Sequence, residues 1–348
     1  MYGENTLLEV EELCVSAGSV PLLRNVSLHI DRGEILGLVG ESGSGKSLTA
    51  LSIMGLLESP PMETTSGRIH FNDLDILKAT DANLEAIRGN DVAMIFQEPM
   101  TSLNPVFTIG DQRVGGILAE PLKVHRVGNK ADQRRRVAEI LALVGLPADA
   151  TTRYAHEFSG GQRQRIAIAR ALVLNPKFLV ADEAVSALDV SIQSQIINLL
   201  NGLQKQLGIT MLFISHDLSV IRHVCDRIAV MYLGRIVETG TITDVLDSPQ
   251  HPYTQALVSA VPNPAKRHEQ RIVLKGELPN AANPPSGCHF NTRCAAINQT
   301  VQEQCSNPGY QTCGQSACHR YPNDRVQLAC HLIPSPYVNH DVSLRNQL

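Results

Sequence analysis

The stretch that decides the fold runs from residue 158 to residue 189 and reads FSGGQRQRIAIARALVLNPKFLVADEAVSALD. Ser159-Gly160-Gly161-Gln162 predicts the start of a helix, because serine is a common N-cap and the two glycines leave backbone N–H groups exposed. A helix N-terminus with free N–H groups favours the binding of an anionic phosphate. Asn175-Pro176 ends this helix, and Phe178 to Ala181 then predicts a short buried strand.

This predicted strand leads into two adjacent carboxylates, Asp182 and Glu183. Paired acids at the carboxyl end of an apolar strand suit a magnesium site beside a base that activates water. Taken alone, the same residues also fit a glycine turn followed by acids on a solvated rim, because short motifs recur by chance. A second phosphate-binding motif decides between the two interpretations.

That second motif is GESGSGKS at residues 40–47, which fits G-x-x-x-x-G-K-[ST] at every fixed position. It follows an apolar segment, Ile35 to Val39, that predicts a strand. In such a loop the backbone N–H groups surround phosphates, Lys46 neutralises the terminal phosphate charge, and Ser47 can hold magnesium. The predicted phosphate-binding residues are Gly40, Ser42, Gly43, Gly45, Lys46, Ser47 and Leu48.

With both motifs in place, the chain over about residues 7–265 resembles the ATPase subunits of ABC transporters. The segments similar to family motifs are the signature motif at 158–162 (with Phe158 where Leu is commoner), Walker B at 178–183, the D-loop at 186–189, the Q-loop at 95–98 and the H-loop at 214–217. Five motifs in the family's order form a specific pattern.

The resemblance implies an α/β fold: a P-loop (RecA-like) ABC ATPase domain with an antiparallel β subdomain and a helical subdomain, plus a small cysteine-rich C-terminal extension. We expect the ATPase domain at residues 1–250, its helical subdomain at about 98–165, and the extension at 251–348. Alternating apolar and polar residues at 7–15 and 22–30 predict an antiparallel strand pair.

The resemblance also implies the roles of the site residues. Glu183 would polarise the attacking water, His216 would fix that water against the γ-phosphate, and Gln97 would sense it. Lys46 would hold the terminal phosphates of ATP. Magnesium would be bound by Ser47, Gln97 and Asp182.

The signature residues Ser159, Gly160, Gly161 and Gln162, together with Asp189 of the D-loop, have no role within one chain. In the family, the signature motif closes on the ATP that the opposite ATPase subunit binds. One phosphate loop and one signature motif per chain therefore imply a dimer with two interfacial sites. We expect the second subunit to be homologous but not identical.

Two features depart from the family pattern. The position of the aromatic residue that stacks on adenine is held by Ala17, and no Phe, Tyr or Trp lies between Tyr2 and Phe71. Either an aliphatic side chain such as Val20 contacts adenine, or the nucleotide affinity is modest. Ala184-Val185 replaces the commoner Pro-Thr, but the preceding acid is present, so we expect a competent ATPase.

Residues 99–105 (PMTSLNP), 251–257 (HPYTQAL) and 261–264 (VPNP) resemble the oligopeptide, dipeptide and nickel importers. This implies an ATPase that powers peptide uptake through two membrane permease subunits, with an external solute-binding protein acting indirectly. The alternatives are a nickel or other small-solute importer and a soluble non-transport ABC ATPase. The soluble ATPase is not supported, because the chain shows neither the long coiled-coil insertion of repair ATPases nor the two ATPase units of ribosomal ones.

The tail holds six of the eight cysteines. In a chain expected inside the cell, clustered thiols favour metal ligation over disulfides. Likeness to some relatives implies a [4Fe–4S] cluster on Cys288, Cys294, Cys305 and Cys330, with Cys313 and Cys318 as alternates. Zinc, with histidine ligands added, and free cysteines are the other interpretations.

Composition limits the partners. The formal net charge of −4 gives no basic field for nucleic acid. The Arg134–Arg136 cluster predicts a solvated helix face, and Asn129-Lys130-Ala131-Asp132 matches a guanine-reading motif only by chance. No apolar run reaches the ~20 residues that span a bilayer, and residues 1–12 predict no export signal. We therefore expect a peripheral protein on the cytoplasmic face of the inner (plasma) membrane, held through the permease subunits.

Overall fold

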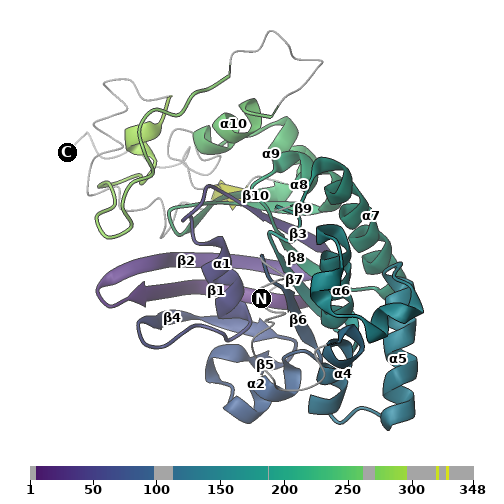
Figure 1. Ribbon diagram of the computed structural model, residues 1–348. Coiled ribbons are helices and arrows are strands. Elements are labelled where there is room, and N and C mark those ends of the chain that lie inside the picture. Colours follow the sequence, from purple (N-terminus) through teal and green to yellow (C-terminus); the bar gives the residue numbers. More distant parts are fainter. Residues whose placement is uncertain are drawn as a thin grey trace, which may run out of the picture.

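The computed structural model describes residues 5–97, 113–186, 188–261 and 271–295, and the backbone of 319–320 and 327–328. Two sheets form its centre (Figure 1). The four-stranded sheet has the order β2-β1-β4-β5 and contains β1 (Thr6–Ala17), β2 (Val20–Asp31), β4 (Met62–Phe71) and β5 (Leu74–Asp75). All its pairings are antiparallel.

The predicted β1–β2 pair is confirmed and is slightly longer than expected. Leu8 pairs with Ile30, and Ala17 pairs with Val20 at the hairpin end. The alternation has its expected cause, because the apolar positions of β1 are buried while intervening residues are more exposed.

The second sheet has eight strands in the order β11-β12-β10-β9-β3-β8-β7-β6. Its strands are β3 (Ile35–Val39), β6 (Val92–Ile95), β7 (Phe178–Asp182), β8 (Thr210–Ile214), β9 (Arg227–Tyr232), β10 (Arg235–Thr241), β11 (His319–Arg320) and β12 (Gln327–Leu328). Strands β6, β7, β8, β3 and β9 run parallel, and β10 pairs antiparallel with β9. Their carboxyl ends therefore meet along one edge of the sheet.

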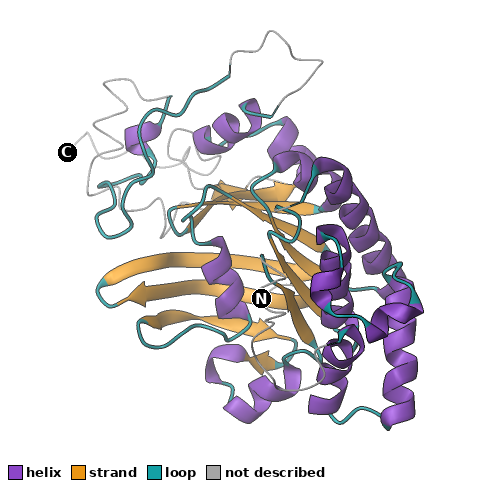
Figure 2. Cartoon of the chain, viewed as in Figure 1, coloured by secondary structure: helices purple, strands orange, loops and turns teal. Residues whose placement is uncertain are grey.

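Helices cover this sheet on both faces (Figure 2). The helices of the described chain are α1 (Lys46–Ile53), α2 (Asp81–Ile87), α4 (Val114–Val124), α5 (Lys130–Leu143), α6 (Gly160–Leu172), α7 (Val190–Leu207), α8 (Leu218–Val224), α9 (Ile242–Asp247) and α10 (Pro252–Ser259). On β3, Leu36 and Leu38 pack in the cluster that contains α1 residues, whereas Ile35 and Val39 pack with residues of α6 to α8. Burial on both faces explains why the parallel strands read as continuous apolar runs.

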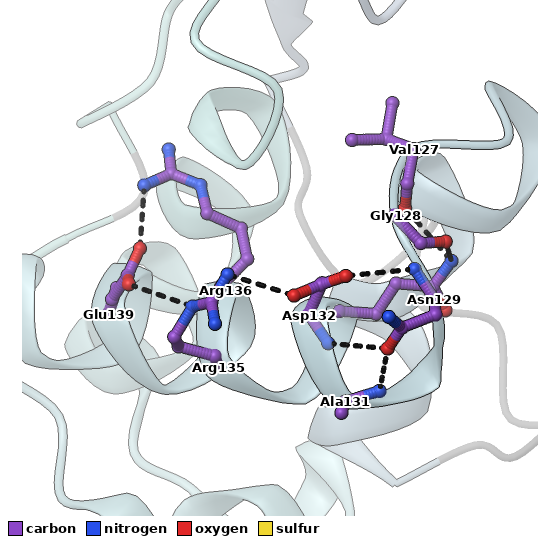
Figure 3. Close-up of polar contacts among 9 residues, drawn as sticks. Val127, Gly128, Asn129, Ala131, Asp132, Arg135, Arg136 and Glu139 are labelled. Carbon is purple, nitrogen blue, oxygen red and sulfur yellow. Dashed lines mark hydrogen bonds and ion pairs between the residues drawn. The ribbon is translucent and has the colours of Figure 1, made fainter.

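Helices α4 and α5 lie within residues 98–165, where the sequence analysis expects a helical subdomain. The N-terminus of α5 is a capping box, in which Asn129 Oδ1 accepts from the N–H groups of Ala131 (2.8 Å) and Asp132 (3.2 Å) (Figure 3). The Asp132 carboxylate in turn accepts from the Asn129 N–H at 3.2 Å. The guanine-motif match is thus a helix cap, as a chance resemblance predicts.

The arginine cluster beside this cap differs in part from expectation. Arg134 and Arg135 are exposed on α5, as predicted. Arg136, however, donates to the Val173 carbonyl at 2.8 Å and to Asn175 Oδ1 just beyond α6. It is bound there because the last carbonyls of a helix need donors from outside the helix.

The described C-terminal segment, residues 271–295, packs on the rest of the chain. Phe290 is buried, and its ring centroid lies 5.2 Å from that of Tyr232 and 5.5 Å from that of Tyr253. Glu238, fully buried on β10, accepts from the N–H groups of Gln250 (2.9 Å) and His251 (3.0 Å) and so fixes the start of α10. Within the described ranges, no helix is long and apolar enough to cross a membrane.

Candidate functional site

The predicted phosphate-binding loop, residues 40–47 (called the phosphate loop below), lies between β3 and the first turn of α1. Its shape requires glycine: a Cβ on Gly40 would lie 2.1 Å from the Met231 carbonyl oxygen, and one on Gly45 would lie 2.7 Å from Leu23 Cδ2. Gly45, at a positive φ of 108°, precedes α1 without a side-chain cap. The first N–H groups of α1 are therefore available to an anion.

Lys46 is buried beneath this loop. Its ammonium donates to the carbonyl oxygens of Gly40 (2.9 Å) and Glu41 (3.0 Å). Burial lowers the pKa of Lys46, and the nearby carboxylates of Glu183, Asp182 and Glu41 act in the opposite direction. A terminal phosphate at this position would meet a cation already held in place.

Asp182 closes the base of the loop from the end of β7. It is 6% exposed, and its Oδ1 has no hydrogen-bond partner among the residues that the structure describes. Burial raises its pKa, and a hydrogen bond from Ser47 acts in the opposite direction. An unpartnered carboxylate oxygen beside a serine hydroxyl fits a magnesium ion, which prefers such oxygen ligands and would favour the charged form.

Glu183 is where three predicted catalytic side chains meet. Its carboxylate Oε2 accepts from Gln97 Nε2 at 3.1 Å and lies 3.6 Å from His216 Nδ1. The Glu183 backbone has a left-handed φ of 46°, and its N–H donates to the Ile214 carbonyl at 3.1 Å. Such strain persists only where the surroundings enforce it, and it often marks a functional position.

These groups share one cavity of about 680 Å³. Its lining is Leu22, Ser42, Gly43, Gly45, Lys46, Ser47, Leu48, Met62, Gln97, Glu183, His216, Leu233, Gly234 and Ala281. Gly40 instead lines a neighbouring cavity of about 360 Å³, which His216 also reaches. The structure therefore brings Gln97, Glu183 and His216 together at the phosphate loop.

The signature motif lies outside this cavity lining. Ser159 caps α6, accepting from the Gln162 N–H at 3.4 Å while Gln162 Oε1 accepts from the Ser159 N–H at 3.0 Å. Gly161 contacts the start of α7, because a Cβ there would lie 2.5 Å from Ile192 Cγ2. Ser159, Gly160 and Asp189 are exposed, so the motif and the D-loop residue face solvent in the single chain.

The apolar end of the cavity was not anticipated. Leu22, Met62, Leu233 and Ala281 line it, whereas the suggested Val20 does not. Met62 pairs across the strands with Ala17, so it lies beside the position where the family has an aromatic residue. Strand register could have identified Met62, but no local sequence signal identifies Ala281.

Of the predicted cluster ligands, Cys288 and Cys294 lie in the described segment, where they are partly exposed and pack against the core. The predicted ligands Cys305 and Cys330 and the alternates Cys313 and Cys318 lie outside the described residues. Over the part of the chain that is described, no group of three or more His, Cys, Asp or Glu side chains is placed to hold a metal. Burial, together with the positive charges of Arg235 and Arg24, lowers the pKa of His289 to about 4.

Family models match two parts of the chain. The model described as "ABC transporter" matches residues 23–186, and the one described as "Oligopeptide/dipeptide transporter, C-terminal region" matches residues 237–305. The oligopeptide transport ATP-binding protein AppF of Bacillus subtilis (strain 168) is 46% identical over 310 residues, covering 87% of this chain and 91% of that protein. Its counterpart OppF of Salmonella typhimurium (strain LT2) is 49% identical over 273 residues, covering 77% and 78%.

Solved structures agree with this similarity. The chain superposes on cbiO1 of Clostridium perfringens, part of the ABC transporter complex cbiONQ, with a TM-score of 0.60 at 28% identity, covering 70% of this chain and 92% of that one. It also superposes on a dimeric bacterial ABC transporter cassette with a TM-score of 0.59 at 28% identity, covering 68% and 98%.

Proposed function

This chain belongs to the ATP-binding proteins of ABC transporters, in the oligopeptide/dipeptide branch, and on that premise we propose that it hydrolyses ATP to power peptide uptake through partner permease subunits. One observation supports the proposal above the others: Lys46, Gln97, Glu183 and His216 line a single cavity around the phosphate loop. Di- or oligopeptides are the expected cargo, because the relatives named above are oligopeptide transport proteins.

Phosphoryl transfer depends mainly on charge neutralisation and an aligned water. Lys46 and the N–H groups at the start of α1 bind the terminal phosphates. Glu183 accepts a proton from the attacking water, while His216 and Gln97 keep that water and the carboxylate in position. Magnesium, held by Ser47, Gln97 and Asp182, would supply positive charge against the phosphates.

The proposed assembly is a dimer of ATPase subunits docked on two permease subunits at the cytoplasmic face of the inner membrane. The exposure of Ser159, Gly160 and Asp189, away from their own cavity lining, supports a role toward a second subunit. A homologous but non-identical partner and an external solute-binding protein complete the proposal. The domain boundary at residue 250 also remains a prediction.

The test is peptide uptake and ATP hydrolysis by the transporter reconstituted with its partner subunits. Glu183→Gln keeps the size of the side chain but removes the base, so hydrolysis should fall by about 10²–10⁴-fold while ATP still binds. The matched control is Glu63→Gln, at an exposed position of β4. Full peptide uptake by the Glu183→Gln variant would contradict the proposed role of Glu183. Uptake of nickel or another solute, with no uptake of peptide, would show that the proposed cargo is wrong.

A finer proposal concerns the tail, where Cys288, Cys294, Cys305 and Cys330 would hold a [4Fe–4S] cluster, with zinc as the alternative. It is supported by Cys288 and Cys294, which lie in one segment and pack against the core. Iron and zinc analysis of protein purified without oxygen tests it. Iron with visible absorption supports the cluster, colourless zinc supports the alternative, and the absence of both metals refutes each.

A further inference from the structure

The C-terminal segment 271–295 is docked directly on the phosphate-binding loop. Arg293, whose side chain is 7% exposed, makes two contacts with the Glu41 carboxylate, at 2.9 and 3.1 Å. Leu278 also lies beside the loop, since a Cβ on Gly43 would come 3.7 Å from Leu278 Cδ2. The segment therefore contacts the loop at two points, Leu278 and Arg293.

Between these two contacts, Arg24 holds the segment to the cavity wall. Arg24 is 8% exposed and donates to the carbonyl oxygens of Ala281 (2.7 Å) and Leu233 (3.1 Å). Its own N–H donates to the Gly234 carbonyl at 2.8 Å. One buried side chain thus joins β2, the β9–β10 turn and the C-terminal segment at the place where Leu233, Gly234 and Ala281 line the cavity.

The chemistry of this end of the cavity is aliphatic. Its side chains are Leu22, Met62, Leu233 and Ala281, and no Phe, Tyr or Trp lines the cavity in the described part of the chain. Lys46 and Ser47 mark the phosphate end, so the apolar end is where the base of a bound nucleotide would lie. A thioether such as Met62 makes favourable contacts with flat rings.

We infer that Ala281 closes the nucleoside end of the site, so that the purine ring binds between aliphatic side chains, and that Arg24 is the positioning residue for this wall. The inference deepens the proposed function and rests on it, because it concerns the nucleotide that the ATPase uses. It also assigns the C-terminal segment a part in nucleotide binding.

The experiment compares two ligands on the full-length chain: ATP, which carries a base, and inorganic tripolyphosphate, which does not. Ala281→Asp places a carboxylate in the wall. Ala282→Asp places the same charge one residue away, at an exposed position outside the lining, and is the matched control. Binding of each ligand is measured by calorimetry in the presence of magnesium.

We expect Ala281→Asp to lower the affinity for ATP about tenfold more than Ala282→Asp does. The reason is that a carboxylate at position 281 would lose its hydration against the apolar ring of the base. Tripolyphosphate should bind the two variants equally, because the added charge is the same. If Ala281→Asp lowered the affinities for ATP and for tripolyphosphate by the same factor, the inference would be overturned. Wild-type protein that binds neither ligand would instead refute the proposed function.

Arg24→Met tests the positioning role. A selective loss of ATP affinity, with tripolyphosphate binding retained, supports it, because the phosphate loop is then intact. Loss of both ligands together would show that Arg24 serves only the fold, and the Ala281→Asp comparison would still decide whether the wall contacts the base.

Discussion

Gly40 accepts no side chain, and this has a measurable cost. A methyl group there would lie 2.1 Å from the Met231 carbonyl oxygen, which belongs to β9 and cannot move without disturbing the sheet. We expect Gly40→Ala to lower the free energy of unfolding by about 3 kcal/mol, at the upper end of overpacking costs. The measurement is urea unfolding.

Gly208→Ala is the control for that change. Gly208 has a positive φ of 65°, but nothing lies within 4 Å of its would-be Cβ. Its substitution carries only the backbone cost, about 1–2 kcal/mol. Equal destabilisation by the two changes would contradict the steric explanation for Gly40.

Glu238 predicts a pH dependence of stability. Burial raises the pKa of its carboxyl group above the usual 4.5, despite the hydrogen bonds that it accepts from the N–H groups of Gln250 and His251. The folded state therefore prefers the protonated form. This contribution is present below pH 4.5 and is lost as pH rises through the raised pKa.

The matching variant is Glu238→Gln, which cannot titrate. We expect the difference in unfolding free energy, wild type minus variant, to decrease as pH rises from about 4.5 toward neutrality, because only the wild type must bury a charge. Urea unfolding at a series of pH values measures it. A difference that is constant, or that increases with pH, would contradict the prediction.

At the scale of elements, α5 tests whether a motif is functional or structural. Asn129→Ala removes the cap and should lower the unfolding free energy by about 1 kcal/mol. Lys130→Ala changes the neighbouring motif position, which makes no cap contact, and should leave stability nearly unchanged. If either variant shifted the preference between GTP and ATP, the match would be functional rather than a cap.

The elements that the sequence predicts well are those with an independent local signal. Strands β3 and β7 are apolar runs followed by phosphate-binding or acidic residues, and α6 begins at a serine cap. The apolar end of the cavity has no such signal, because Met62 is placed there by its register with Ala17 and Ala281 by the Arg24 side chain. Arg136 was misjudged for the same reason, since its partners lie beyond the end of α6.

At the scale of the whole molecule, the exposed signature motif predicts an effect on the partner subunit. Ser159→Arg should leave the affinity of this chain's own cavity for MgATP unchanged, since Ser159 does not line it. Hydrolysis at the site completed by Ser159 should fall by about 10²-fold or more, as when a preorganised polar donor is lost.

The assay is steady-state hydrolysis in the complete transporter, with the other site inactivated by removal of its catalytic acid. Gln195→Arg, an exposed position in the first turns of α7, is a control for added charge. Weaker ATP binding by the isolated Ser159→Arg chain would argue that the motif acts within one subunit.

Tyr253 and Arg293 have a consequence for how this protein can be divided. Tyr253 accepts a hydrogen bond from the Glu41 N–H at 2.9 Å, and Arg293 pairs with the Glu41 carboxylate. Both residues therefore support the phosphate loop through Glu41, although they follow residue 250 in sequence. A catalytic unit transplanted into another transporter would lose this support if it were cut at residue 250, so the transferable unit extends at least to residue 295.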